Sequence, residues 1–167
     1  VSYATKSKFP SMRSLYSSTS GNPDLKSEFG RSFELSATYN KGFFLSGSFF
    51  LNALRDFINT VLVDGTRRYY NVNRAHINGF ELQAQKAWAW GGFGMDALAN
   101  YTFLDHKNET DNRPLDALPK QNGTFELGFR PLSRLRLGLT GIVASNSWWW
   151  NSSTSELLTI PSYFSLD

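Results

Sequence analysis

The sequence predicts an all-β fold, an antiparallel up-and-down β-barrel whose strands cross a membrane. Three observations carry this prediction. Apolar and polar residues alternate along much of the chain, which is typical of strands with one apolar and one polar face. Tight turns alternate with longer polar connections, as in outer-membrane barrels. The stretch from Phe43 to Val63 contains no proline and could form one strand of roughly 20 residues, far longer than a usual soluble strand.

The composition bounds the class of protein. The chain has 167 residues, which is room for one ordinary domain, and 16% of them are aromatic, which argues against wholesale disorder. Its net charge of +3 comes without a dense block of lysine and arginine, so nucleic acid is not an expected partner. The absence of cysteine excludes disulfide scaffolds, thiolate metal sites and thiol catalysis. No apolar run is long enough for a transmembrane helix.

Five segments show the alternation most clearly, and each is expected to form a strand. One face of each segment carries mainly aromatic and aliphatic residues, and the other carries mainly polar residues and glycine. The segments are Ser32–Asn40, Asn78–Lys86, Gly94–Asp105, Thr124–Arg130 and Leu135–Ser145.

The polar faces include groups that would be unfavourable in a packed sandwich core but suit a wet or plugged lumen. These inward residues are Asp96, Asn100, Glu126, Arg130 and Arg136. By the same alternation, we expect Leu137 and Leu139 to face lipid and Arg136 to face the lumen.

The connections are expected to alternate in length along the chain. Short turns, which would lie on the periplasmic side, are predicted at Asn40–Gly42, Trp90–Phe93 and Pro131–Arg134. Long polar connections, which would form extracellular loops, are predicted at Ser17–Glu28, Asp64–Asn73, His106–Asn122 and Asn151–Thr159.

Aromatic residues gather near both predicted ends of the strands, which favours two aromatic girdles at the membrane boundaries. The residues assigned to the girdles are Tyr39, Phe43, Trp88, Trp90, Phe93, Tyr101 and Phe103. The alternative is that aromatic side chains simply favour strands.

No catalytic, cofactor or metal site is predicted. The segment Asp105–Asp111 is rich in oxygen ligands but lacks the spacing of a calcium loop, so a solvated loop is the better interpretation. Glu34, Glu81 and Glu126 lie on separate strands without a visible acid/base partner. The glycines of Gly91–Gly94 precede a strand rather than a helix, which indicates a hairpin rather than a phosphate-binding turn.

Two groups of residues in the long-loop regions are candidates for ligand binding. Arg67, Arg68, Tyr69 and Tyr70 combine cationic and aromatic groups, which suit anionic chelates or flat aromatic ligands. The run Trp148, Trp149 and Trp150 offers a stacking surface. For both groups the alternative is packing in a girdle or at the rim of the loops.

Several motifs, in order along nearly the whole chain, resemble those of TonB-dependent outer-membrane receptors. Phe9–Tyr16 reads FPSMRSLY and Gly21–Glu28 reads GNPDLKSE, where Ser27 replaces the family's usual proline. Tyr70–Leu82 resembles the family's "Y-x-N…A…G-x-E" strand, and Asn100–Asp105 resembles its "Y-T-x-x-D" strand. Pro119 then precedes a further strand, as in the family.

This resemblance implies a barrel of about 22 strands in the outer membrane of a Gram-negative bacterium, with a plug domain inside. Such receptors import ferric siderophores or, less often, solutes such as cobalamin, with TonB acting through the plug. Residues 1–167 would be part of the barrel domain, with about eight strands from its C-terminal third and without the plug or a TonB-binding segment. The expected partners are outer-membrane lipid, the solute and, through the plug, TonB.

Two alternatives stay open at this point. One is a soluble β-sandwich carbohydrate-binding module whose exposed Trp and Tyr residues stack on sugar. The other is a small, complete eight-strand outer-membrane barrel with a structural or adhesive role.

Overall fold

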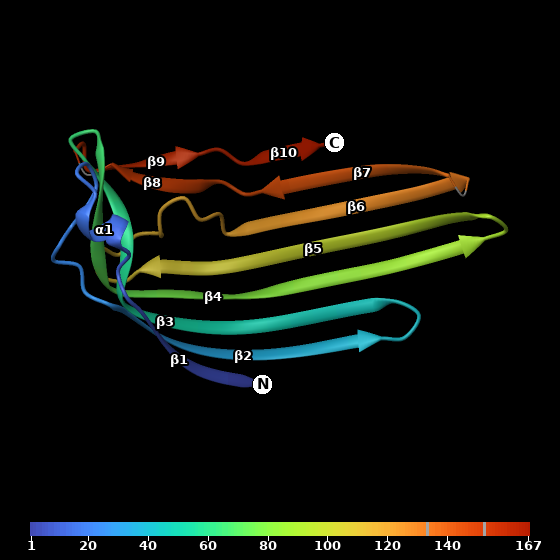
Figure 1. The fold of residues 1–167 in the computed structure, drawn as a ribbon, viewed down its shortest axis with the longest axis horizontal. Coiled ribbons are helices and arrows are strands. Elements are labelled where there is room, and N and C mark those ends of the chain that lie inside the picture. The colour runs from blue at the N-terminus through green and yellow to red at the C-terminus, as the bar shows by residue number, and fades with distance from the viewer. Residues whose placement is uncertain (133, 152) are drawn as a thin grey trace.

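The computed structural model describes residues 1–132, 134–151 and 153–167, apart from the side chain of Leu62. Its strands form a single sheet, antiparallel except for one pair at Leu62 and Asn151, with one short helix at one end (Figure 1). The elements are β1 (Ser2–Lys8), α1 (Met12–Tyr16), β2 (Glu28–Asn40), β3 (Phe44–Val63), β4 (Thr66–Trp90), β5 (Phe93–Asn108), β6 (Gln121–Leu132), β7 (Leu135–Ala144), β8 (Ser147–Asn151), β9 (Glu156–Ile160) and β10 (Tyr163–Leu166). No helix in the described ranges is long and apolar enough to cross a membrane.

The sheet has the up-and-down order that the sequence predicts. Strands β1 to β7 pair in chain order, and β10 pairs with β7. The hairpin of β8 and β9 prolongs β7 and β10 toward the same end as the helix (Figure 1). The β-sandwich alternative is wrong, because the described strands make one sheet rather than two packed ones. The eight-strand closed barrel is also wrong, since β1 and β10 lie at opposite edges of an open sheet.

The pairing register separates an apolar from a polar face. One row on the apolar face crosses four strands and contains Leu35, Phe49, Phe80 and Phe103. A row on the polar face crosses five strands and contains Thr38, Ser46, Gln83, Asn100 and Thr124. Alternation along the sequence therefore becomes two chemically distinct surfaces.

Three of the charged residues expected on the polar face form ion pairs there. Asp96 Oδ2 lies 2.8 Å from Arg136 Nη2, and Asp96 Oδ1 lies 3.2 Å from Arg130 Nη2. Leu137 pairs with Phe129 and Leu139 with Leu127, so both leucines lie on the opposite, apolar face. The predicted facing of Arg136 relative to these leucines is confirmed.

The short turns sit at one end of the sheet, where glycine permits the backbone to reverse. Gly91 and Gly92 have φ of 48° and 111°, and Gly42 has φ of 77°, conformations that favour glycine. The predicted turns at Asn40–Gly42 and Trp90–Phe93 are confirmed. In the third predicted turn, Ser133 lies outside the described residues, between β6 and β7.

Two predicted loops at the other end are wrong in extent. Asp64–Asn73 is almost entirely strand, because the two-residue turn of Asp64 and Gly65, with φ of 49° and 74°, joins β3 directly to β4. The charged and tyrosine-bearing residues after this turn continue the ladder. Asn151–Thr159 contains the end of β8 and the start of β9, and Ser152 within it lies outside the described residues.

A small core fills the end of the sheet that carries the long connections. Val72, Ala75 and Leu115 are buried there, with Leu54 and Ile77 packed against them. Leu115 belongs to the connection between β5 and β6, so this loop folds over the ends of β3 and β4. The short helix α1 was not predicted; Ser11 caps it by accepting a hydrogen bond of 3.1 Å from the Ser14 amide.

Candidate functional site

Segments far apart in sequence meet at the long-connection end of the sheet (Figure 1). The Asp64 amide donates to Ser153 Oγ at 2.8 Å, which joins the β3–β4 turn to the β8–β9 connection. The Ala117 amide donates to the Trp148 carbonyl at 2.7 Å, and the Tyr69 amide donates to the Ser20 carbonyl at 3.0 Å. We call this assembly of the β3–β4 tip, the 109–120 loop and the β8–β9 hairpin the loop end.

Arg113 lies at the centre of the loop end. Its Nη1 is 3.0 Å from Asp116 Oδ1, and its Nη2 donates to Tyr70 Oη at 2.8 Å. Its guanidinium carbon also lies 5.1 Å from the ring centroid of Trp150. The side chains of Arg113 and Asp116 are only 10% and 3% exposed, so the pair is buried and its geometry is fixed by several contacts at once.

Asp116 links this pair to the backbone of β8. Its Oδ1 accepts a hydrogen bond of 3.0 Å from the Trp150 amide as well as the contact from Arg113. Burial raises the pKa of the Asp116 carboxyl, and the Arg113 charge opposes that rise. Burial likewise raises the pKa of the Tyr70 hydroxyl. The contacts therefore hold both Tyr70 and Trp150 against one guanidinium.

Arg67 forms a second cation–aromatic contact beside the first. Its guanidinium carbon lies 4.3 Å from the ring centroid of Trp149, within the range of a cation–π interaction. Arg67 and Arg68 are exposed, whereas Tyr69 and Trp149 are partly buried. The loop end thus presents positive charge to solvent over a base of aromatic rings.

The segment Asp105–Asp111 is not the solvated loop that the sequence predicts. His106 and Asn108 belong to β5 and are only 3% and 1% exposed. Asn108 Oδ1 accepts hydrogen bonds from the Thr110 and Asp111 amides, which folds the start of the 109–120 loop. The side-chain oxygen of Asn108 therefore stabilises a turn.

His106 is hydrogen-bonded to the backbone of the same loop. Its Nδ1 accepts a hydrogen bond of 3.1 Å from the Leu115 amide. Burial lowers the pKa of His106 from its ordinary value, so the ring is neutral near pH 7. No group of three or more histidine, aspartate or glutamate side chains in the described part of the chain is placed to hold a metal ion.

Comparison with known families decides the class of this protein. The sequence model of the family described as "TonB dependent receptor-like, beta-barrel" matches residues 1–167. The chain belongs to the TonB-dependent receptors. This match confirms the resemblance seen in the sequence. Members of this family are outer-membrane receptors and transporters of Gram-negative bacteria.

Solved structures share the fold at low sequence identity. The copper transporter OprC is 19% identical with a TM-score of 0.74, and the match covers 98% of this chain and 26% of OprC. The siderophore receptor PiuA from Acinetobacter baumannii is 18% identical with a TM-score of 0.68, covering 98% of this chain and 26% of PiuA. The FrpB iron transporter from Neisseria meningitidis (F3-3 variant) is 18% identical with a TM-score of 0.56, and the match covers 86% of this chain and 24% of FrpB. The chain thus spans about a quarter of these proteins.

In this TonB-dependent receptor chain, the two predicted ligand-binding groups lie together. Arg67 contacts Trp149, and Tyr70 is joined to Trp150 through Arg113. Sequence reasoning missed Arg113 and Asp116. The signal that was present is an arginine flanked by acids, Asp111 and Asp116, within a connection that also contains Pro114 and Pro119.

The residues assigned to aromatic girdles lie at both ends of the apolar face. Trp88 pairs with Met95 and Trp90 with Phe93 near the short turns, and the ring of Phe43 lies 5.1 Å from that of Tyr39. Farther along β5, Tyr101 pairs with Leu82, and the ring of Phe103 lies 5.5 Å from that of Phe80. Their contact with membrane lipid stays a prediction.

Proposed function

We propose that residues 1–167 form part of the barrel wall and external loops of a receptor for TonB-energised uptake of a ferric siderophore or a similar scarce solute, with a cobalamin-like ligand as the alternative cargo. The observation that carries the proposal is the pair of cation–aromatic contacts, Arg67 with Trp149 and Arg113 with Trp150, at the loop end of a TonB-dependent receptor sheet. Guanidinium groups and indole rings together suit anionic, aromatic chelates. Two of the similar solved structures are described as a siderophore receptor and an iron transporter.

The apolar face would lie against lipid in the outer membrane. From Phe93 to Phe103 this face rises roughly 34 Å along β5. At the 35–45° tilt of outer-membrane strands, that rise is a height of about 24–28 Å, close to the apolar band of roughly 25 Å in such barrels. The polar face, with Asp96, Arg130 and Arg136, would line the lumen, where a plug domain would sit.

The seven candidate residues have distinct roles in this proposal. Arg67 and Arg68 attract the anionic solute from solvent, and Tyr69 and Trp149 offer faces for stacking. Arg113 and Asp116 act as positioning residues that hold Tyr70 and Trp150, while Trp148 anchors the 109–120 loop through its carbonyl. Release into the barrel then depends on the plug and on TonB, which this chain would contact only through the plug.

Binding of ferric siderophores to the full-length receptor that carries this chain tests the proposal. We expect Arg67→Gln to weaken the Kd of the chelate about tenfold, because one charge and one cation–π contact are lost. Tryptophan fluorescence quenching measures the Kd, and uptake of radioactive iron measures transport. Arg130→Gln is the matched control, since Arg130 pairs with Asp96 at the opposite end of the sheet. An unchanged Kd in Arg67→Gln, for a chelate that the receptor demonstrably transports, would contradict the assigned site.

A further inference from the structure

A row that contains several basic residues crosses the apolar face on the side of the loop end, next to the row of Phe33 and Leu51. Arg31 pairs with Ala53, Ala53 with His76, and His76 with Lys107, so these side chains share the apolar face. In the next row, Phe29 pairs with Arg55 and Arg55 with Arg74. Arg31, Arg55 and Arg74 are all exposed.

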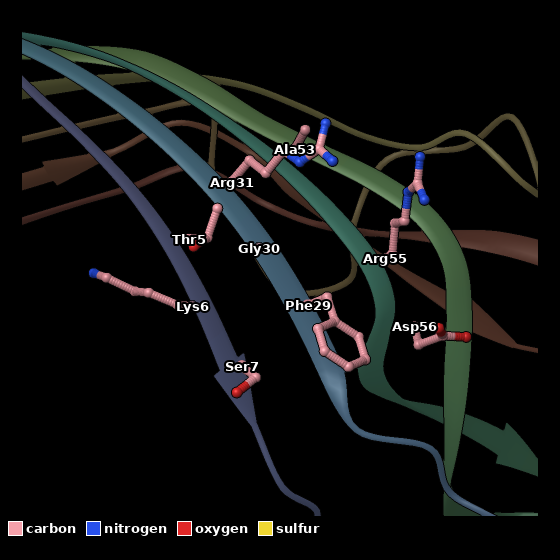
Figure 2. Close-up of a pocket in the computed structure, with 9 residues that line it drawn as sticks. All are labelled: Thr5, Lys6, Ser7, Phe29, Gly30, Arg31, Ala53, Arg55 and Asp56. Atoms are coloured by element: carbon pink, nitrogen blue, oxygen red, sulfur yellow. The ribbon is translucent and has the colours of Figure 1, made fainter.

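Two of these arginines line a hollow of about 610 Å³ beside β1, β2 and β3, on the apolar face of the sheet (Figure 2). Arg31 and Arg55 extend from β2 and β3 on the same side, while Lys6 points away from them (Figure 2). Thr5 and Ser7 add hydroxyl groups, and Asp56 is the one carboxylate among the described lining residues. Among the residues that the structure describes, no ion pair joins Arg31, Arg55 or Arg74 to a carboxylate.

The surface directly below this hollow is apolar. Phe33 pairs with Leu51 in the row beneath Arg31, and Leu35 pairs with Phe49 in the row after that. Phe33, Leu35, Phe49 and Leu51 are all exposed large side chains. The hollow is therefore lined by cationic and hydrogen-bonding groups, and the apolar surface begins next to it on the side of the short turns.

We propose that this hollow binds the phosphorylated headgroup of a lipid in the outer leaflet, with its acyl chains lying on the apolar rows below. A guanidinium forms short, charge-assisted and bidentate hydrogen bonds to phosphate oxygens, which lysine matches less well. Two guanidinium groups lie on one face of the sheet, next to an apolar surface. This arrangement suits an anionic lipid better than a free inorganic anion. The inference rests on the proposed placement of the apolar face in the outer membrane. It concerns the outside of the wall, whereas the solute site lies at the loop end.

The test uses the full-length receptor extracted from outer membranes in mild detergent. Native mass spectrometry counts bound lipid A, a phosphorylated and acylated glucosamine disaccharide, in the original receptor and in Arg31→Gln/Arg55→Gln. We expect the double variant to bind lipid A at least tenfold more weakly. Lys86→Gln is the matched control, because Lys86 lies on the same face near the short turns and should leave lipid A binding unchanged.

Three outcomes would overturn the lipid site. One is equal binding of lipid A by the original receptor and the double variant. A second is equal binding of lipid A and its dephosphorylated form, which would remove the role of phosphate. A third is displacement of lipid A by 10 mM inorganic phosphate, the concentration chosen as about a thousandfold excess over protein, which would assign the hollow to a free anion. Siderophore uptake is measured on the same variants. A variant that loses lipid binding but keeps uptake shows that the lipid site and the proposed transport function can be tested separately.

Discussion

The guanidinium of Arg113 contacts two carboxylates, a phenol and an indole ring. Asp111 and Asp116 supply the carboxylates, Tyr70 the phenol and Trp150 the indole ring. Removing the arginine would leave Asp116 buried without its charge partner, which is a costly state in a protein interior.

We therefore expect Arg113→Ala to loosen the loop end by about 3 kcal/mol. Hydrogen exchange of the amides in β8, including Trp150, should become roughly 100-fold faster. Arg68→Ala serves as the control, because Arg68 is exposed, and it should leave this exchange unchanged. Adding Asp116→Asn to Arg113→Ala should restore part of the protection; no recovery would show that the buried charge is not the cause.

We expect His106 to make the packing of the 109–120 loop depend on pH. Because burial lowers the pKa of His106, the unfolded segment binds more protons than the folded one between the lowered pKa and about 6.5. The free energy of opening the loop therefore falls as pH drops through that window. Exchange of the Leu115 amide, corrected for its intrinsic pH dependence, measures the effect. His106→Gln should abolish the pH dependence, and an unchanged profile would point to another group.

At the scale of elements, the β3–β4 hairpin depends on its two-residue turn. Gly65 has a φ of 74°, and a side chain in this left-handed region costs about 1–2 kcal/mol. Gly65→Ala should accelerate hydrogen exchange at the hairpin tip by about 5–30-fold. Gly138→Ala is the matched control, since an added methyl group there meets open space without a left-handed φ. Equal exchange in the two variants would mean that the turn adapts without strain.

The same hairpin shows where sequence reasoning succeeds and where it stops. Alternation correctly separates Arg136 from Leu137, because side-chain facing depends only on local period. The start of the strand after Gly65 is predicted as a loop, because its residues are mainly polar. The structure shows that these polar residues are stabilised by partners from distant parts of the chain. Asn71, for example, accepts a hydrogen bond of 2.8 Å from the Lys26 amide. Such support from a distant segment leaves no periodic signal.

Sequence reasoning also singled out both groups of candidate residues but not the contacts that join them. Arg67, Tyr70 and Trp149 stand out because cationic and aromatic residues cluster locally. Arg113 reaches Tyr70 across 43 positions of sequence, and no local pattern reports that contact. The burial of His106 was missed for the same reason, since Leu115 covers it only after the loop folds back.

At the scale of the whole molecule, the two faces of the sheet predict opposite exposure in the membrane. In a cysteine-free full-length receptor, Leu137→Cys should resist a water-soluble thiol reagent in intact outer membranes, whereas Arg136→Cys should react with it. The rates of labelling in membranes and after denaturation give the comparison. Equal rates at the two positions in membranes would contradict the proposed orientation.

The contact between the β3–β4 and β8–β9 hairpins reaches across the sheet rather than between chain neighbours. Leu62 pairs in parallel with Asn151, and Asp64 bonds to Ser153 nearby. In an up-and-down wall, each hairpin can otherwise lengthen or shorten without disturbing any strand but its neighbour. Here an insertion in one hairpin would displace the point at which the other is held. A change in the length of one hairpin should therefore be tolerated only together with a matching change in the other, so the two hairpins behave as one structural unit.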